Sequence, residues 1–351
     1  MTIQELIMAA RQAKASDIHI TADRNPVFRI NGMLKETEYN LTKNEKTDII
    51  FSMLDGNQLD HFKMGNDVDM AYMLPNGQRQ RVNVFRQQKK IAAVLRIIND
   101  NTPTFDELNL PEILRQLSDE PRGLILVTGP TGSGKSTTLA AMIDYINSNR
   151  ACHILTIEDP IEYVYKQKKA LIHQRDVGFD VASFSAALRS AMREDPDVIL
   201  VGEMRDYETI SAAITAAETG HLVMSTLHTT SAASTVDRII DVFPPHSQQQ
   251  IRTQLANVLK GVITQTLLPK ANGSGRVAAF EIMTGSDAVL NLIRESKVHQ
   301  INSTIQTSSK QGMVLLDNAL ANLVNKGIVT KEDAMEKANN RIELQNNIGR
   351  Y

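Results

Sequence analysis

The chain has 351 residues, 42% of them apolar and 22% charged, which is enough for two globular domains of unequal size. Its 38 basic residues nearly balance 40 acidic ones, which argues against a broad electrostatic surface for nucleic acid. A single cysteine, Cys152, excludes an intrachain disulfide framework and a cysteine-rich zinc site. No apolar run reaches the ~18 residues that span a bilayer, and no signal peptide is visible, so we expect a cytoplasmic protein without membrane insertion.

Residues 1–98 are predicted to form an α+β domain. Residues 2–13 have apolar positions at helical spacing, and residues 75–77 (Pro-Asn-Gly) predict a hairpin turn. Four segments show the alternation or β-branched content of strands: 17–21, 27–32, 67–74 and 79–98. The polar segment 99–111 contains two prolines and has no sustained period, so we interpret it as a linker.

From residue 112 to residue 351 the pattern changes to short apolar segments separated by helix-period segments. The apolar segments are 123–129, 153–159, 197–203 and 221–228. Because strands that are apolar on both faces lie in sheets covered by helices on both sides, this pattern predicts an α/β domain with a mainly parallel sheet. Residues 286–351 have a helical pattern, in which Gly327 is expected to end one helix and residues 330–333 to begin the last one.

A phosphate-binding loop is the clearest motif. The sequence "GPTGSGKS" lies between a predicted strand and a predicted helix and matches G-x-x-x-x-G-K-[ST]. Glycines let the loop bend so that backbone N–H groups converge on phosphates, and the N-terminus of the following helix favours the anion. Lys135 should reach the β- and γ-phosphates, and the Ser136 hydroxyl should bind Mg²⁺. The predicted nucleoside triphosphate site comprises Gly129, Pro130, Thr131, Gly132, Ser133, Gly134, Lys135, Ser136 and Thr137.

Polar residues stand at the ends of three other predicted strands, where parallel α/β proteins place their chemistry. A carboxylate at the end of an apolar strand is typical of the acid beside Mg²⁺, often acting through water, and Glu203 fits this role. Glu158 can then orient or deprotonate the attacking water, although spacing alone allows the two roles to be exchanged. His228 taken by itself is more typical of a structural histidine, and Arg205 and Asp206 are as typical of a local ion pair as of functional groups.

Taken together, these motifs resemble the secretion ATPase superfamily, and within it the PilT-type retraction ATPases of type IV pili. The resemblance covers essentially the whole chain. It rests on "ASDIHIT" (15–21), "FRINGMLK" (28–35), "RVNVFRQQKKIAAVLRII" (81–98), "GPTGSGKSTTLAAMIDYIN" (129–147), "TIEDPIEY" (156–163), "REDPDVILVGEMRD" (193–206) and "TGHLVMSTLHTTSAASTVDRIIDVFP" (219–244).

The resemblance implies a PAS-like N-terminal domain, a RecA-like P-loop ATPase domain and a homohexameric ring that hydrolyses ATP. Rotation between the two domains would convert hydrolysis into force for pilus retraction and twitching motility. The implied partners are a pilus platform protein of the inner membrane and a second retraction ATPase, with no role for nucleic acid. The chain is accordingly expected at the cytoplasmic face of the inner membrane.

The resemblance also implies roles for single residues. Glu158 is similar to the catalytic glutamate of the family, Glu203 to its Walker B acid, and His228 to a histidine that senses the site. Arg81 and Arg96 resemble N-terminal-domain arginines that reach the γ-phosphate. A cation on one domain bound to the γ-phosphate ties domain closure to ATP, and hydrolysis removes that tie. Arg86 is a third candidate for this role.

One segment departs from the family, and alternatives remain. Residues 288–295, "AVLNLIRE", have Leu290 where the retraction-associated motif has arginine, which leaves the direction of force open. Pilus-extension and type II secretion ATPases commonly carry a tetracysteine zinc subdomain, which one cysteine cannot supply. A DNA-pumping motor needs a basic stripe that is not visible here. A non-catalytic, nucleotide-dependent regulator is disfavoured because Lys135, Glu158 and Glu203 are all present.

Overall fold

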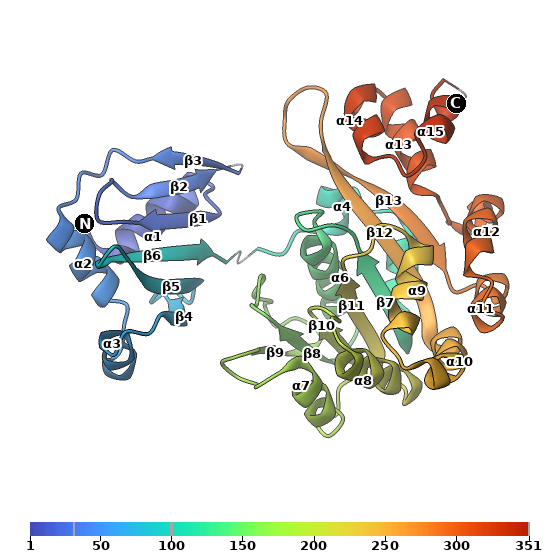
Figure 1. Ribbon diagram of the computed structural model, residues 1–351, viewed down its shortest axis with the longest axis horizontal. Helices are drawn as coiled ribbons and strands as arrows, with labels where there is room; N and C mark the ends of the chain where they lie inside the picture. Colours follow the sequence, from blue (N-terminus) through green and yellow to red (C-terminus); the bar gives the residue numbers. More distant parts are fainter. Residues whose placement is uncertain (31, 99–100, 350–351) are drawn as a thin grey trace. The chain divides into compact units, whose positions relative to one another are not determined.

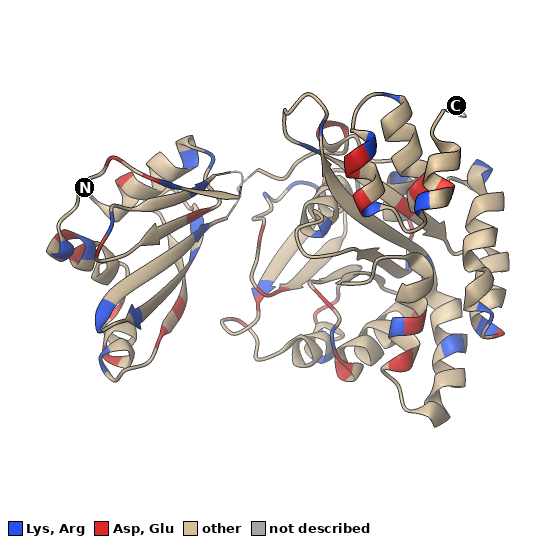
Figure 2. Ribbon diagram, turned by 45° about the horizontal axis from the view of Figure 1, so that its top comes forward, with Lys and Arg blue, Asp and Glu red and all other residues tan. Residues whose placement is uncertain are grey.

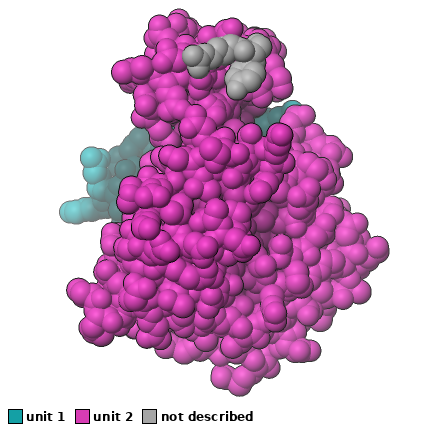
Figure 3. Space-filling view, turned by 90° about the vertical axis from the view of Figure 1, so that its right-hand side faces the viewer, with its two compact units in different colours: residues 1–101, 162–164 teal, residues 102–161, 165–351 magenta. Residues whose placement is uncertain are grey.

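The structure is a computed structural model that describes residues 1–30, 32–98 and 101–349 (Figure 1). The chain divides into two compact units, Met1–Asn101 with Glu162–Val164, and Thr102–Ile161 with Tyr165–Tyr351. Figure 3 colours the two units separately. Residues 99 and 100 of the predicted linker lie outside the described part of the chain. The later linker residues contain a short helix, α4 (Phe105–Leu108), in which Phe105 is buried.

The first unit contains one antiparallel sheet with strand order β3-β2-β1-β6-β5-β4. The strands are β1 (Asp17–Ile20), β2 (Val27–Ile30), β3 (Met33–Glu36), β4 (Val68–Met73), β5 (Arg79–Gln87) and β6 (Lys90–Ile97). Its helices are α1 (Ile3–Gln12), α2 (Lys43–Phe51) and α3 (Gly56–Lys63). Alternate strand residues such as Ile18, Val82 and Leu95 are buried with the helices in one hydrophobic cluster. The other sheet face therefore carries the polar residues of these strands.

The predicted elements of this unit are present, with additions. The helix expected over residues 2–13 is α1, and the expected Pro-Asn-Gly turn joins β4 to β5, where the Leu74 N–H donates to the Gln78 carbonyl oxygen at 2.8 Å. Residue 31 of the predicted strand 27–32 lies outside the described residues. Strand β3 and helices α2 and α3 were not predicted. Both helices begin with capping boxes, Thr42 with Glu45 and Asp55 with Gln58.

The second unit is built on a seven-stranded sheet with order β13-β12-β7-β11-β10-β8-β9. All neighbouring strands in it are parallel except the β12–β13 hairpin, which is antiparallel, and this confirms the mainly parallel α/β class. The strands are β7 (Gly123–Thr128), β8 (His153–Glu158), β9 (Leu171–Asp176), β10 (Val198–Val201), β11 (Leu222–Leu227), β12 (Leu259–Pro269) and β13 (Arg276–Thr284). The four predicted strands are β7, β8, β10 and β11, and the other three were missed.

Helices connect and cover these strands. They are α5 (Ile113–Ser118), α6 (Lys135–Asn149), α7 (Phe184–Ala191), α8 (Tyr207–Glu218), α9 (Ala232–Asp241) and α10 (Gln248–Val258). Every residue of β7 and of β11 is buried, as expected for strands covered on both faces. Within the described residues, no helix is both long enough and apolar enough to cross a membrane.

The C-terminal residues are helical, as predicted. The helices are α11 (Asp287–Arg294), α12 (Ile301–Thr307), α13 (Leu316–Asn325), α14 (Lys331–Lys337) and α15 (Arg341–Asn347). Gly327 follows α13 with φ +67°. The Thr330 side chain caps α14 by accepting from the Asp333 N–H, as its sequence indicates. The expectation that this is the last helix is wrong, because Asn340 caps α15. Residues 350 and 351 lie outside the described part.

Candidate nucleotide-binding and catalytic site

The predicted phosphate-binding loop connects β7 to α6 and has a backbone that requires glycine. Gly129, Gly132 and Gly134 all have positive φ, at +138°, +77° and +91°. Gly129 is also crowded: a Cβ there would collide with the Gln265 carbonyl oxygen and lie 2.7 Å from Ser133 Oγ. Gly134 is the N-cap of α6, so the N–H groups of the first helical turn follow the loop directly. This loop has the conformation expected of a phosphate cradle.

Lys135, the first residue of α6, reaches back over the loop. Its Nζ donates to the carbonyl oxygens of Gly129 at 2.8 Å and Pro130 at 3.1 Å. These two hydrogen bonds, both to neutral acceptors, hold the ammonium group at the loop. A phosphate oxygen carries more negative charge than a carbonyl oxygen, so it can replace these partners without a large movement of the side chain.

Gln265, on β12, supports the loop from the neighbouring strand and was not predicted. Its Nε2 donates to the Ser133 carbonyl oxygen at 2.6 Å, and both residues are buried. One position earlier on β12, the Thr264 hydroxyl is hydrogen bonded to the Thr128 hydroxyl at 2.8 Å. Sheet pairing of β12 with β7 brings these residues together. No local sequence signal could have identified them, because they are more than 130 positions from their partners.

The polar residues that follow the predicted strands lie together at the carboxyl ends of neighbouring parallel strands. Strands β11, β10 and β8 are parallel neighbours, and His228, Glu203 and Glu158 stand at or just after their carboxyl ends. Glu158 is 8% exposed, and its Oε1 accepts from Thr156 Oγ1 at 2.7 Å and from Gln174 Nε2 at 3.3 Å. These two donors hold the carboxylate in a defined orientation.

Glu203 and His228 contact each other. The Oε2 atom of Glu203 lies 3.4 Å from His228 Nε2 and 2.6 Å from Arg205 Nε. The Asp206 side chain instead accepts from the Thr209 N–H at 2.8 Å and caps α8, so Arg205 and Asp206 have separate partners. A cavity of about 220 Å³ adjoins this cluster, lined among others by Asp159, Glu203, Arg205 and Asp206.

Arg81 and Arg96 lie directly opposite each other on β5 and β6 of the first unit, whose basic and acidic residues Figure 2 colours. Arg81 donates to Asp69 through Nη2 at 2.6 Å and through Nε at 3.1 Å, and Arg96 Nε donates to Asp17 Oδ1 at 3.2 Å. Like charges directly opposite on a sheet repel each other, and Asp69 and Asp17 each offset one of the two guanidinium charges. Arg86 is different: its Nη1 donates to the Phe62 carbonyl oxygen on α3, and its guanidinium lies 3.9 Å from the Phe62 ring.

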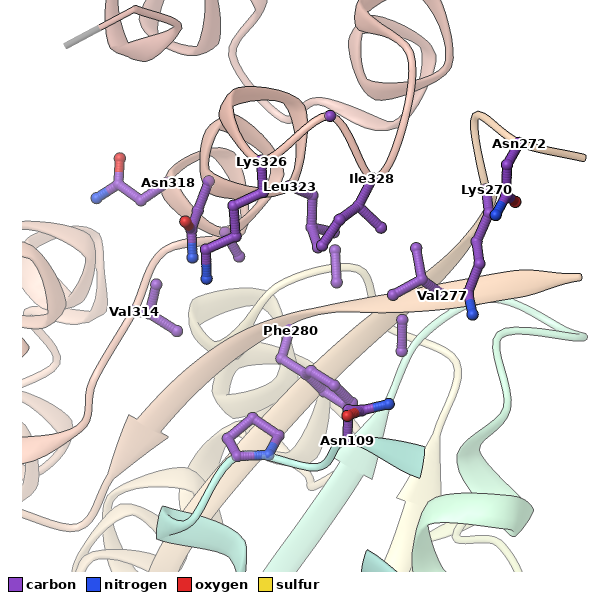
Figure 4. A pocket seen from close by; sticks show the side chains of 16 residues that line it. Asn109, Lys270, Asn272, Val277, Phe280, Val314, Asn318, Leu323, Lys326 and Ile328 are labelled. Carbon is purple, nitrogen blue, oxygen red and sulfur yellow. The ribbon is translucent and has the colours of Figure 1, made fainter. Parts of the chain in front are cut away.

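A larger groove, of about 740 Å³, lies in the second unit between β13, α13 and the segment 109–111 (Figure 4). Phe280 and Val277 lie along it, and Lys270 and Lys326 extend into it. None of the predicted nucleotide or catalytic residues lines this groove. Cavity size alone therefore does not identify the site that the motifs define.

The fold and these motifs together define a secretion-type P-loop ATPase, and comparison with known proteins gives the same answer. The family described as "Type II/IV secretion system protein" matches residues 1–345, and the chain belongs to this family. The type IV pilus retraction ATPase PilT of Pseudomonas aeruginosa is 50% identical over 339 residues, covering 96% of this chain and 98% of that protein. A twitching motility protein of Neisseria gonorrhoeae is 49% identical over 316 residues, or 90% and 84% of the two chains.

A solved structure extends the similarity to three dimensions. The crystal structure of the pilus retraction motor PilT with bound ADP matches with a TM-score of 0.92 and 46% identity, covering 99% of both chains. The family and the retraction-ATPase resemblance inferred from the motifs are thereby confirmed. The PAS-like description of the first unit is compatible with this match but stays a prediction.

Proposed function

We propose that this chain is a motor ATPase that couples ATP hydrolysis to retraction of a type IV pilus. It works as a homohexamer on a platform protein at the cytoplasmic face of the inner membrane, with a second retraction ATPase as a further partner. The observation that carries the proposal is the phosphate loop beside Glu158, Glu203 and His228 at adjacent strand ends, in a chain 50% identical to PilT over nearly its whole length.

The site residues suit Mg²⁺-ATP. The loop from Gly129 to Thr137 offers backbone N–H groups and Lys135 to the phosphates, and the hydroxyl of Ser136 and the carboxylate of Glu203 are oxygen donors of the kind that Mg²⁺ prefers. When bound, Mg²⁺ neutralises charge on the phosphate oxygens. Glu158, held by Thr156 and Gln174, orients the attacking water and accepts its proton. His228, in contact with Glu203, links the end of β11 to this site.

Arg81 and Arg96 supply the link between the units. Two guanidinium groups side by side on one sheet face can donate hydrogen bonds to the same γ-phosphate, and their mutual repulsion falls when the anion binds. Hydrolysis removes the γ-phosphate and with it this interaction, so the nucleotide state determines how the two units are oriented.

Leu290, the departure from the retraction-associated motif, fits the local packing of the second unit. It lies on α11, is partly buried, and packs against the main hydrophobic core of the second unit. Arg294, which does match the retraction-associated motif, is held by hydrogen bonds to Asn291 and Asn257 at 2.9 and 3.3 Å. Leucine at position 290 therefore adds apolar contact to the core and leaves the neighbouring arginine in place.

ATP turnover by the purified full-length protein tests the enzymatic part. Lys135→Ala should weaken nucleotide binding, whereas Glu158→Gln should keep binding and lower turnover by about 10²-fold or more. Glu332→Gln, a carboxylate on α14 far from these motifs in the chain, is the control and should leave turnover unchanged. Wild-type turnover no faster than that of the two variants would sink the proposal.

A gene deletion tests the direction of force. Loss of a retraction motor leaves cells with excess pili that do not retract, and reintroducing the wild-type gene should restore retraction. Bald cells would instead indicate a pilus-extension motor, which is the alternative that the sequence leaves open.

A further inference from the structure

Asp17, in the segment "ASDIHIT", lies between two arginines on the polar face of the first unit's sheet. In the strand register it is directly opposite Arg96 on β6 and directly opposite Arg29 on β2. Its Oδ1 accepts from Arg96 Nε at 3.2 Å, and its Oδ2 lies 3.7 Å from Arg29 Nε and accepts from Ser16 Oγ at 2.8 Å. The side chain of Asp17 is 10% exposed, whereas that of Arg96 is 64% exposed.

These residues belong to a row of charged side chains that extends over five strands. Arg29, Asp17, Arg96 and Arg81 are consecutive register partners on β2, β1, β6 and β5, and Asp69 on β4 holds Arg81. Three arginines and two aspartates leave the row with one net positive charge. The two carboxylates therefore hold the guanidinium groups, offset two of their three positive charges and leave one in excess.

The way in which Asp17 holds Arg96 leaves the outer end of the guanidinium group available. The hydrogen bond is made to Nε, at the inner side of the group. Within residues 1–30, 32–98 and 101–349, Nη1 and Nη2 of Arg96 have no hydrogen-bond partner. These two nitrogens form the fork that recognises phosphate in a bidentate manner.

We propose that Asp17 is a positioning residue for the ATPase reaction: it fixes the guanidinium of Arg96 so that its two terminal nitrogens are presented to the γ-phosphate. The inference rests on the proposed contact of Arg96 with ATP. An exposed arginine side chain has many rotamers, and fixing it in advance removes an entropic cost from the step in which it contacts the reacting phosphate.

The direction in which one substitution changes the rate of ATP hydrolysis distinguishes positioning of Arg96 from a general effect of charge. Asp17→Asn preserves size and one acceptor oxygen but raises the net charge of the row from one to two. If the row acts only through its charge, the variant should bind and hydrolyse ATP better. If Asp17 positions Arg96, the variant should be slower in spite of the added positive charge.

The experiment measures steady-state ATP hydrolysis by the full-length protein over a range of ATP concentrations. Asp17→Asn should lower kcat roughly tenfold with little change in KM, and Asp17→Ala should lower it further, because misplacing a reacting group by about 1 Å can cost up to 10²-fold. Binding of a fluorescent ADP analogue, which has no γ-phosphate, should be unchanged. Asp23→Asn is the control, since Asp23 forms an exposed ion pair with Lys90 at 2.8 Å in the same domain, and it should behave as wild type.

A double mutant distinguishes positioning from general damage to the domain. Arg96→Ala should be slow, and adding Asp17→Asn to it should have no further effect, because Asp17 acts through Arg96. Two results would overturn the inference alone. One is an Asp17→Asn enzyme that hydrolyses ATP at or above the wild-type rate. The other is that Asp17→Asn slows the Arg96→Ala enzyme by the same factor by which it slows the wild-type enzyme. An Arg96→Ala enzyme with wild-type turnover refutes the role of Arg96 in the proposed function, and the role of Asp17 with it.

Discussion

Substitution of Gln265 by methionine tests whether β12 holds the phosphate-binding loop in shape. Gln265 is 2% exposed and donates to the Ser133 carbonyl oxygen at 2.6 Å. Methionine has a similar length and fills the same space but cannot donate. Gln265 Oε1 is itself buried without a hydrogen-bond partner among the described residues, so the substitution also removes an unsatisfied acceptor. We therefore expect little change in overall stability and a specific effect on the loop.

The size of that effect follows from the single hydrogen bond that is lost. A hydrogen bond of this kind contributes about 0.5–1.5 kcal/mol. Each 1.4 kcal/mol corresponds to a factor of ten in an equilibrium constant. If the binding-competent conformation of the loop is destabilised by this free energy, nucleotide binds about 2- to 12-fold more weakly. Turnover at saturating ATP should change much less, because Gln265 contacts the phosphate-binding loop and not the carboxylates of Glu158 and Glu203.

The assay is titration of a fluorescent ATP analogue, accompanied by the thermal unfolding midpoint. Gln254→Met is the matched control, because Gln254 donates to Glu218 at 2.9 Å on the exposed surface of the same unit, and its affinity should equal that of wild type. A Gln265→Met protein that unfolds at the wild-type temperature and binds nucleotide with wild-type affinity would refute the view that β12 supports the loop.

Two further predictions concern the loop backbone and a buried acid. Gly129→Ala should abolish measurable nucleotide binding in the same titration, because at φ +138° the new Cβ collides with the Gln265 carbonyl oxygen. Gly132 has open space around it, so Gly132→Ala should cost only the ~1 kcal/mol of left-handed backbone strain. Equal nucleotide affinities for the two variants would contradict the crowding argument. Burial raises the pKa of Glu281, whose carboxylate accepts from the N–H groups of Ala232 and Leu316. The ionised form therefore destabilises the fold above that raised pKa, and protonation relieves this as pH falls toward the ordinary value of 4.5. As the pH is lowered from 8 to 5, the unfolding temperature of the wild-type protein should rise relative to that of Glu281→Gln. If the difference between the two unfolding temperatures does not change with pH, the assigned cause, burial of Glu281, is wrong.

The elements that sequence alone predicted are those whose signals are local. The β7–loop–α6 unit is contiguous, so its glycines, Lys135 and the flanking strand and helix can be read together. Strands β8, β10 and β11 are recognisable because burial on both faces requires an uninterrupted apolar run. Glu158, Glu203 and His228 could be expected at one edge because parallel strands end on the same side.

What sequence could not predict depends on contacts between distant segments. Strand β12 contains three consecutive buried polar residues, Thr264, Gln265 and Thr266, which conceal its apolar pattern. Strand β9 lies at the sheet edge, and only two of its six residues are fully buried, so its sequence "LIHQRD" looks like a loop. The neighbours Arg205 and Asp206 were as typical of a local ion pair as of functional groups, and the structure shows that Arg205 contacts Glu203 whereas Asp206 caps a helix.

The arginine row shows the same limit. Arg81 and Arg96 were expected to act together, but only the antiparallel register of β5 and β6 shows that they are adjacent. Asp17 is 79 positions from Arg96 in the chain, so its contact with that guanidinium follows from strand pairing and not from any motif. The polar residues of "ASDIHIT" acquire a specific interpretation only once the strands beside them are known.

The central claim, that the γ-phosphate sets the orientation of the two units, is tested most directly by a distance measurement between them. Spin labels can be placed at Met64→Cys and Ile342→Cys, which are 80% and 75% exposed in the first and second units, with Cys152→Ser removing the only native thiol. In spin-diluted protein carrying Glu158→Gln, we predict one distance distribution with ATP and another with ADP or without nucleotide, and we predict that Arg96→Ala abolishes the ATP-specific distribution. A single distribution in all three states would contradict the account.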